Sequence, residues 1–104
     1  MARTVTWSET AWRDLESTAD YIAEDSPGYA AAFVERIRDQ GRSLDQLAFR
    51  GRMVPELGEP AVRELLVGNY RLIYEIHETA VYVLGVVHGA RDLAALWDRE
   101  GRSL

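Results

Sequence analysis

The sequence predicts a two-layer α+β domain, in which a helical hairpin packs on a small, mainly antiparallel sheet in the chain order β-α-α-β-β-β. Apolar residues first recur at helical spacing between residues 9 and 47. The chain then changes to three strand-like runs with two short turns between them, over residues 62–88. A short alternating segment at residues 3–7 supplies one further strand.

Length and composition predict a single domain spanning residues 1–104. Apolar residues make up 47% of the chain and charged residues 28%, which is ordinary for a globular protein. Cysteine is absent, so disulfides and thiolate metal sites are excluded, and we expect no metal or cofactor. No apolar run reaches about 18 residues and no signal region follows Met1, so we expect a cytoplasmic protein without a membrane contact.

The charge balance argues against generic nucleic-acid binding. The formal net charge is −5, with seventeen carboxylates against twelve basic residues, all of which are arginine. Domains that bind nucleic acid through charge alone are usually basic. The arginines could still gather into a local basic patch on an acidic body.

The N-terminal half contains both predicted helices. Val5 and Trp7 share one face of the first strand, and Ser8 is a suitable N-cap for the helix that follows. The apolar stripe of this helix consists of Ala11, Trp12, Leu15, Ala19 and Ile22. Trp12, together with Trp7 and Trp97, is expected to anchor the core.

A second helix is predicted from Pro27 toward Leu47, because Asp25-Ser26-Pro27 both stops the first helix and starts the next. Its stripe consists of Ala30, Phe33, Val34, Ile37, Leu44 and Leu47. Gly41 lies inside this helix, which suggests a kink or a close helix–helix contact. So short a link between the helices predicts an antiparallel hairpin.

An irregular connection at residues 50–60 leads into the three strands, which turn at Gly68-Asn69 and at residues 77–79. The last strand is apolar on both faces and is expected to be central, with the first strand at a sheet edge or beside it. Asp92 could cap a short final helix over residues 93–99, with Leu96 and Trp97 packing back.

Arginines recur in and beside the strands, at Arg63, Arg71 and Arg91, with Arg52 before them. Side chains opposite one another on paired strands lie about 5 Å apart, so Arg63 and Arg71 are predicted to share a face and to meet an anion or an acidic partner. The alternative for each is an ion pair on a solvated face. Candidate partners for such pairs are Glu64, Glu75 and Asp92.

His88 ends the last strand, where it could act as a general acid or base or contact a phosphate. A strand-end histidine bonded to a backbone carbonyl is the favoured alternative. Tyr70 and Tyr74 should lie on one face with Leu72, in the core or on the sheet surface. Neither a Ser-His-Asp set, a Gly-rich phosphate loop nor a metal-ligand spacing stands out.

Several segments follow one another in a familiar order. In the N-terminal half these are Trp7-Ser8 with Ala11 and Leu15, Tyr21-Ile22-Ala23, and Asp25-Ser26-Pro27. In the C-terminal half they are Gly51-Arg52-Met53-Val54-Pro55-Glu56-Leu57, Arg63-Glu64-Leu65, Tyr70-Arg71-Leu72-Ile73-Tyr74 and His88-Gly89-Ala90-Arg91-Asp92. Together they resemble the RelE/ParE toxin superfamily, and the ParE-like branch in particular.

The resemblance implies a type II toxin that a small antitoxin, encoded beside it, binds and neutralises. RelE-like members cut mRNA on the ribosome, using basic residues on the sheet and a C-terminal tyrosine or histidine. ParE-like members keep the fold, usually lack that set and poison DNA gyrase. By position, Arg52, Arg63, Arg71 and Arg91 match basic groups of the RelE-like branch, and His88 lies close to them.

The absence of lysine, the absence of tyrosine after Tyr82 and the acidic balance favour the ParE-like branch. We therefore expect a non-enzymatic inhibitor of DNA gyrase. The alternative is a ribosome-dependent endoribonuclease in which Arg63, Arg71 and Arg91 steady the phosphate and His88 moves a proton. A third possibility is a non-toxic relative.

The expected partners are a cognate antitoxin and DNA gyrase or, under the alternative, the ribosome with mRNA. The antitoxin should place an amphipathic helix against apolar surface and carboxylates near Arg71 or Arg91. The expected partner-binding residues are Arg63, Arg71, Arg91, Tyr74, Leu96 and Trp97.

Overall fold

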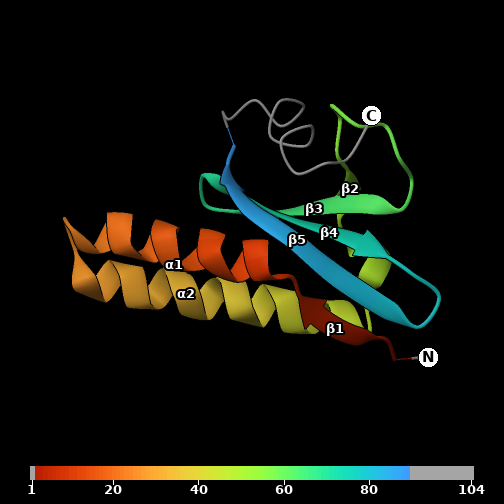
Figure 1. Ribbon diagram of the computed structural model, residues 1–104, viewed down its shortest axis with the longest axis horizontal. Helices are drawn as coiled ribbons and strands as arrows, with labels where there is room; N and C mark the ends of the chain where they lie inside the picture. Colours follow the sequence, from red (N-terminus) through yellow and green to blue (C-terminus); the bar gives the residue numbers. More distant parts are fainter. Residues whose placement is uncertain (1, 90–104) are drawn as a thin grey trace.

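Two helices cover one face of a five-stranded mixed sheet in the computed structural model, which describes residues 2–89 (Figure 1). The sheet order is β1-β5-β4-β3-β2. β1 pairs in parallel with β5, and the other pairs are antiparallel. The strands are β1 (Thr4–Trp7), β2 (Arg52–Met53), β3 (Val62–Val67), β4 (Tyr70–Ile76) and β5 (Ala80–His88).

This arrangement confirms the predicted α+β class and the mainly antiparallel sheet. β5 lies between β1 and β4, so the strand that is apolar on both faces is internal, and β1 is an edge strand beside it. The two-residue strand β2 was not predicted. Arg91, Asp92, Leu96, Trp97 and the expected final helix lie outside the described residues.

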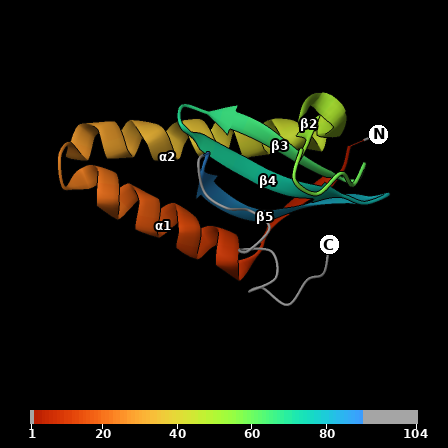
Figure 2. The ribbon, with the colours of Figure 1, turned by 90° about the horizontal axis from the view of Figure 1, so that it is seen from above.

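The helical hairpin forms as the capping residues predict. α1 spans Glu9–Ala23, and the Ser8 hydroxyl accepts a hydrogen bond from the Ala11 backbone N–H at 3.0 Å. α2 spans Pro27–Arg42, and the Ser26 hydroxyl accepts one from the Tyr29 N–H at 3.2 Å. The helices pack against each other and diverge away from the turn that connects them (Figure 2). No helix within residues 2–89 is long and apolar enough to cross a membrane.

The second helix ends earlier than predicted. After Arg42 the chain tightens into two 3₁₀ turns, η1 (Ser43–Asp45) and η2 (Ala48–Arg50). Leu44 is still buried, but Leu47 is 56% exposed, because its backbone has left the helical conformation. The expectation that Leu47 continues the buried stripe is therefore wrong.

Gly41 makes a close approach, but to β1 and not to the other helix. A Cβ at this position would lie 3.2 Å from Cζ2 of the Trp7 indole. Trp7 in turn stacks on Trp12, with ring centroids 4.7 Å apart. Trp12 is 40% exposed, so it covers Trp7 from the solvent side, and its predicted role as a core anchor is wrong.

The main core lies between the helices and the sheet, and Leu15, Phe33 and Ile37 meet Leu72 and Tyr74 there. A smaller apolar cluster lies on the opposite face, where Val54, Val62, Ile73 and Val87 are buried with Leu57 and Leu84 packed against them. We call this opposite side the open face. Because Val54 and Leu57 follow β2, the loop after β2 folds over the open face.

Candidate functional site

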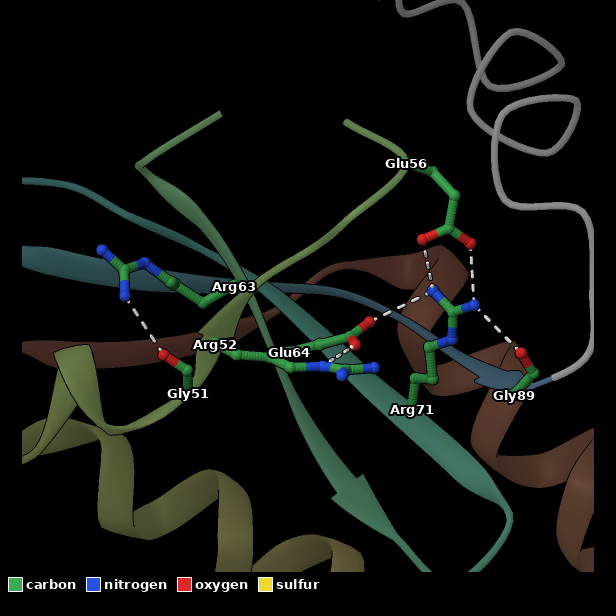
Figure 3. A network of polar contacts seen from close by, with 7 residues as sticks. All are labelled: Gly51, Arg52, Glu56, Arg63, Glu64, Arg71 and Gly89. Atoms are coloured by element: carbon green, nitrogen blue, oxygen red, sulfur yellow. Dashed lines mark hydrogen bonds and ion pairs between the residues drawn. The ribbon is translucent and has the colours of Figure 1, made fainter. Parts of the chain in front are cut away.

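Arg71 is the centre of a polar network on the open face (Figure 3). Its guanidinium donates to both carboxylate oxygens of Glu56, from Nη1 at 3.0 Å and from Nη2 at 2.7 Å. Nη1 also donates to Oε1 of Glu64 at 3.2 Å, and Nη2 to the carbonyl of Gly89 at 2.9 Å. Arg71 is only 8% exposed, so these bonds form in a largely dry setting where charge-assisted pairs are strong.

Glu64 links Arg71 to Arg52. Nε of Arg52 donates to Oε2 of Glu64 at 2.6 Å, and the Glu64 side chain has no exposed surface. A buried carboxylate is costly unless each oxygen has a partner, and here each has a guanidinium. Arg52, Glu64, Arg71 and Glu56 therefore form a chain of alternating charge whose formal charges cancel.

Strand register brings these side chains together. Arg52 lies opposite Glu64 across β2 and β3, and Arg71 lies opposite Leu66 across β3 and β4. Glu64 and Leu66 are two residues apart, so they project from the same face. Glu56 comes from the loop after β2. Sequence analysis missed it, because nothing local shows that this loop folds over the sheet.

The polar network shifts the pKa values of Glu56 and Arg71. The hydrogen bonds from Arg71 hold the pKa of the Glu56 carboxyl below its ordinary value, against the smaller opposing effect of burial. The pKa of Arg71 is raised in turn, mainly by its bonds to Glu56. Both shifts favour the charged forms, so the pair is ionised at neutral pH.

Arg63 does not share a face with Arg71. It lies opposite Tyr74 and alternates with Glu64, so it projects from the helix-covered face. Nε of Arg63 donates to the Pro60 carbonyl at 2.8 Å, and Nη1 to the Gly51 carbonyl at 3.2 Å. The predicted pairing of the two arginines on one face is therefore wrong, because the tight turn sets a register that separates them.

His88 also lies away from Arg71. It is opposite Tyr70, and the two rings meet edge to face with centroids 5.3 Å apart. Tyr70 contacts Phe33 of α2, which places this pair on the helix side of the sheet. The predicted convergence of His88 and the arginines is therefore wrong within the described residues.

A shallow pocket of about 330 Å³ lies beside His88, between α1 and the end of β5. Its lining includes Asp14, Ser17, Thr18, Tyr21, Tyr70 and His88. Asp14 is engaged in the fold, since its Oδ2 accepts a hydrogen bond from the Val86 backbone N–H at 3.0 Å. The pocket therefore offers one imidazole and hydroxyl groups without a nearby guanidinium from Arg52, Arg63 or Arg71.

Tyr74, expected to contact a partner, has no exposed surface. Its hydroxyl donates to the Ala48 carbonyl at 2.7 Å and accepts from the Gly51 N–H at 3.0 Å. Burial raises its pKa above the ordinary tyrosine value. Tyr74 therefore holds the segment before β2 from inside the core and is not part of the protein surface. Over residues 2–89, no three His, Asp or Glu side chains are placed to hold a metal ion.

Solved structures share this architecture. A chain of a chromosomal ParDE toxin–antitoxin system from P. aeruginosa is similar with a TM-score of 0.69 and 23% identity, covering 84% of this chain and 96% of that one. A chain of the RelBE2 toxin–antitoxin complex from Mycobacterium tuberculosis is similar with a TM-score of 0.56 and 29% identity, covering 85% and 99%. The YoeB dimer from Staphylococcus aureus is similar with a TM-score of 0.60 and 15% identity, covering 85% and 98%. A search of curated protein sequences found no match.

The fold is therefore that of the RelE/ParE toxins. The model of the family described as ParE toxin of type II toxin-antitoxin system, parDE, matches residues 5–93. The chain belongs to this family.

Proposed function

We propose that this protein is a toxin that acts by binding and inhibiting DNA gyrase, and that a cognate antitoxin neutralises it by direct binding. Membership of the ParE family supports the toxin assignment. The similar chains from P. aeruginosa and M. tuberculosis come from toxin–antitoxin systems, which supports an antitoxin partner. Because gyrase acts on DNA inside the cell, the proposal also implies a cytoplasmic protein.

The observation that carries the choice of gyrase over mRNA is the pairing of Arg71. A nuclease of this fold needs cations free to stabilise charge that develops on a phosphate. Arg71 instead donates hydrogen bonds to Glu56, Glu64 and the Gly89 carbonyl. To meet a phosphate it would have to leave a bidentate carboxylate pair.

Geometry supports the same choice. Arg52 and Arg71 bond the same carboxylate, that of Glu64. Arg63 and His88 project from the other face of the sheet. Two of these four groups therefore lie on each face of the sheet. A protein-binding inhibitor needs no such convergence, since its surface has only to match a partner.

Two assays on the purified full chain and one expression experiment in cells test the proposal. The protein should inhibit DNA supercoiling by gyrase, should leave mRNA on ribosomes uncut, and should induce the SOS response with filamentation when expressed. Co-expression with the adjacent antitoxin should abolish these effects. Rapid translation arrest with mRNA cleavage would support the nuclease, and a chain inert in both assays would support a non-toxic relative.

Two variants sharpen the comparison. His88→Ala should leave gyrase inhibition nearly unchanged, whereas a nuclease that uses His88 for proton transfer should lose about 10²–10⁴-fold in cleavage rate. Arg91→Ala, chosen from the sequence alone, should weaken target binding by a few kcal/mol if it forms a buried charge pair with the target. Loss of mRNA cleavage in His88→Ala would overturn the gyrase proposal.

A further inference from the structure

The guanidiniums of two arginines, Arg3 and Arg63, lie over the exposed ring of Phe49. Cζ of Arg3 lies 5.4 Å from the ring centroid and Cζ of Arg63 lies 5.5 Å from it, both within cation–π range. Arg50 follows Phe49 in η2. Phe49 is 60% exposed, so this cluster forms molecular surface.

Neutral acceptors hold these guanidiniums in place. Nε of Arg3 donates to the His77 carbonyl at 2.9 Å, and Nη1 of Arg50 donates to the Ser43 hydroxyl at 2.8 Å. Arg63 donates to two backbone carbonyls, as described above. Within residues 2–89 none of the three forms an ion pair with a carboxylate. In the part of the chain that the structure describes, these three guanidiniums bond neutral acceptors, whereas those of Arg52 and Arg71 bond carboxylates.

Apolar side chains accompany the charges. Leu47 is 56% exposed and Met53 is 40% exposed. Leu47 precedes η2, and Met53 lies opposite Arg63 across β2 and β3. We call the surface formed by Arg3, Leu47, Phe49, Arg50, Met53 and Arg63 the Phe49 patch. It combines cations with exposed apolar surface on a chain whose net charge is −5.

We propose that the Phe49 patch binds an acidic protein segment that also carries apolar side chains, and that the toxin holds its target protein through this contact. Guanidinium groups bind carboxylates through paired N–H donors, and Leu47, Phe49 and Met53 supply the apolar counterpart. The inference rests on the proposed protein-binding mode, but not on gyrase being the target.

Two observations favour a protein segment over nucleic acid. The net negative charge of the chain repels a long polyanion, whereas a short acidic segment presents its carboxylates only to the local cluster. Guanidiniums also lie over the Phe49 ring, and a base that stacked there would have to displace them.

Labelled probes test the chemistry directly. Fluorescence anisotropy would compare a peptide of glutamate and leucine, the same peptide with lysine for glutamate, and an oligothymidylate of equal charge to the acidic peptide. We expect the full chain to bind the acidic peptide at least about tenfold more tightly than either other probe. Equal binding of the two peptides, or tighter binding of the oligothymidylate, would overturn the proposal.

Matched variants locate the contact. Arg3→Glu with Arg50→Glu, and separately Phe49→Ala, should each weaken binding of the acidic peptide about tenfold or more. Arg36→Glu with Arg38→Glu makes the same change in net charge on exposed positions of α2 and should bind as wild type does. Circular dichroism would establish that all three proteins are folded. Equal binding by patch and control variants would refute the assignment.

Binding to purified gyrase separates this inference from the proposed function. If gyrase binds wild type and the Phe49→Ala variant equally, the patch is not the target contact, although the proposed function stands. If the patch binds the acidic peptide but wild type does not bind gyrase, the target is wrong and the patch is supported.

Discussion

The hydroxyl of Tyr74 lies 3.0 Å from the backbone nitrogen of Gly51, and this contact fastens the segment between α2 and β2 to the middle of the sheet. The same hydroxyl donates to the Ala48 carbonyl at 2.7 Å. One buried side chain thereby satisfies two backbone groups in irregular structure, where no strand or helix partner is available. The Phe49 patch and β2 both depend on this anchor, since Phe49 lies between the two anchored residues.

Gly51→Ala should destabilise the protein by about 1–3 kcal/mol or more. A Cβ at position 51 would lie 2.4 Å from the Tyr74 hydroxyl oxygen and 2.7 Å from the Glu64 carbonyl oxygen, so the chain must move. Denaturant unfolding measures the loss. Gly28→Ala is the control, because nothing lies within 4 Å of its Cβ position, and it should match or exceed wild type. A Gly51→Ala protein as stable as wild type would disprove the close packing.

Tyr74→Phe should cost about 1–3 kcal/mol, because it leaves the Gly51 N–H and the Ala48 carbonyl without their buried partner. Burial also raises the Tyr74 pKa above the ordinary 10.0, so the stability that this phenol contributes is complete below about pH 10 and is lost as pH rises toward its native-state pKa. Unfolding at rising pH should therefore show a smaller alkaline loss for Tyr74→Phe. Tyr21→Phe, at an exposed position, should behave as wild type does.

Asp14→Ala should destabilise the packing of α1 on β5. The Val86 N–H, which donates to Asp14 at 3.0 Å, follows the irregularity in the β4–β5 register and would lose its partner. The expected cost is about 1–3 kcal/mol. Asp20→Ala, at an exposed position of the same helix, should change stability by less than about 0.5 kcal/mol. Hydrogen exchange should also speed up at Val86 in Asp14→Ala, and unchanged protection there would contradict the assignment.

Arg71→Ala should be strongly destabilising, by about 3–5 kcal/mol, because Glu64 would keep its charge in a buried site with only Arg52 beside it. Arg13→Ala removes an exposed pair with Glu9 and should cost less than about 1 kcal/mol. Thermal and denaturant unfolding compare the two variants. The Arg71→Ala, Glu64→Gln double variant should recover part of the loss, since the buried charge is then gone, and no recovery would argue against the proposed cause.

Acid should weaken the same network. The pKa of Glu56 is depressed in the folded protein, so its contribution is complete above the ordinary value of 4.5 and is lost as pH falls through the lower, native-state pKa. Stability measured from about pH 6 down to about pH 3 should fall more steeply for wild type than for Glu56→Gln. Identical slopes would show that Glu56 does not contribute.

Local patterns in the sequence predicted both helices and four of the five strands, but not the short strand β2. Ser8 and Ser26 mark the helix starts, because each hydroxyl accepts a hydrogen bond from the backbone N–H three residues later. The apolar run of β5 predicts an internal strand, because such a strand is covered on both faces. The predicted length of α2 was wrong, because the helix ends at Arg42 and the backbone of Leu47 is no longer helical.

The arrangement of the candidate site could not be predicted from the sequence, because it depends on contacts between residues far apart in the chain. The sequence places Arg63 and Arg71 on neighbouring strands, but strand register puts them on opposite faces, and a shift of one residue would reverse this. Arg71 bonds Glu56, fifteen residues away in the sequence, and Phe49 contacts Arg3 from the N-terminal end of the described chain. Periodicity and capping report forces between neighbours in the chain. Whether a charge is neutralised or left on the surface depends on what folding brings beside it, and only the tertiary structure decides that.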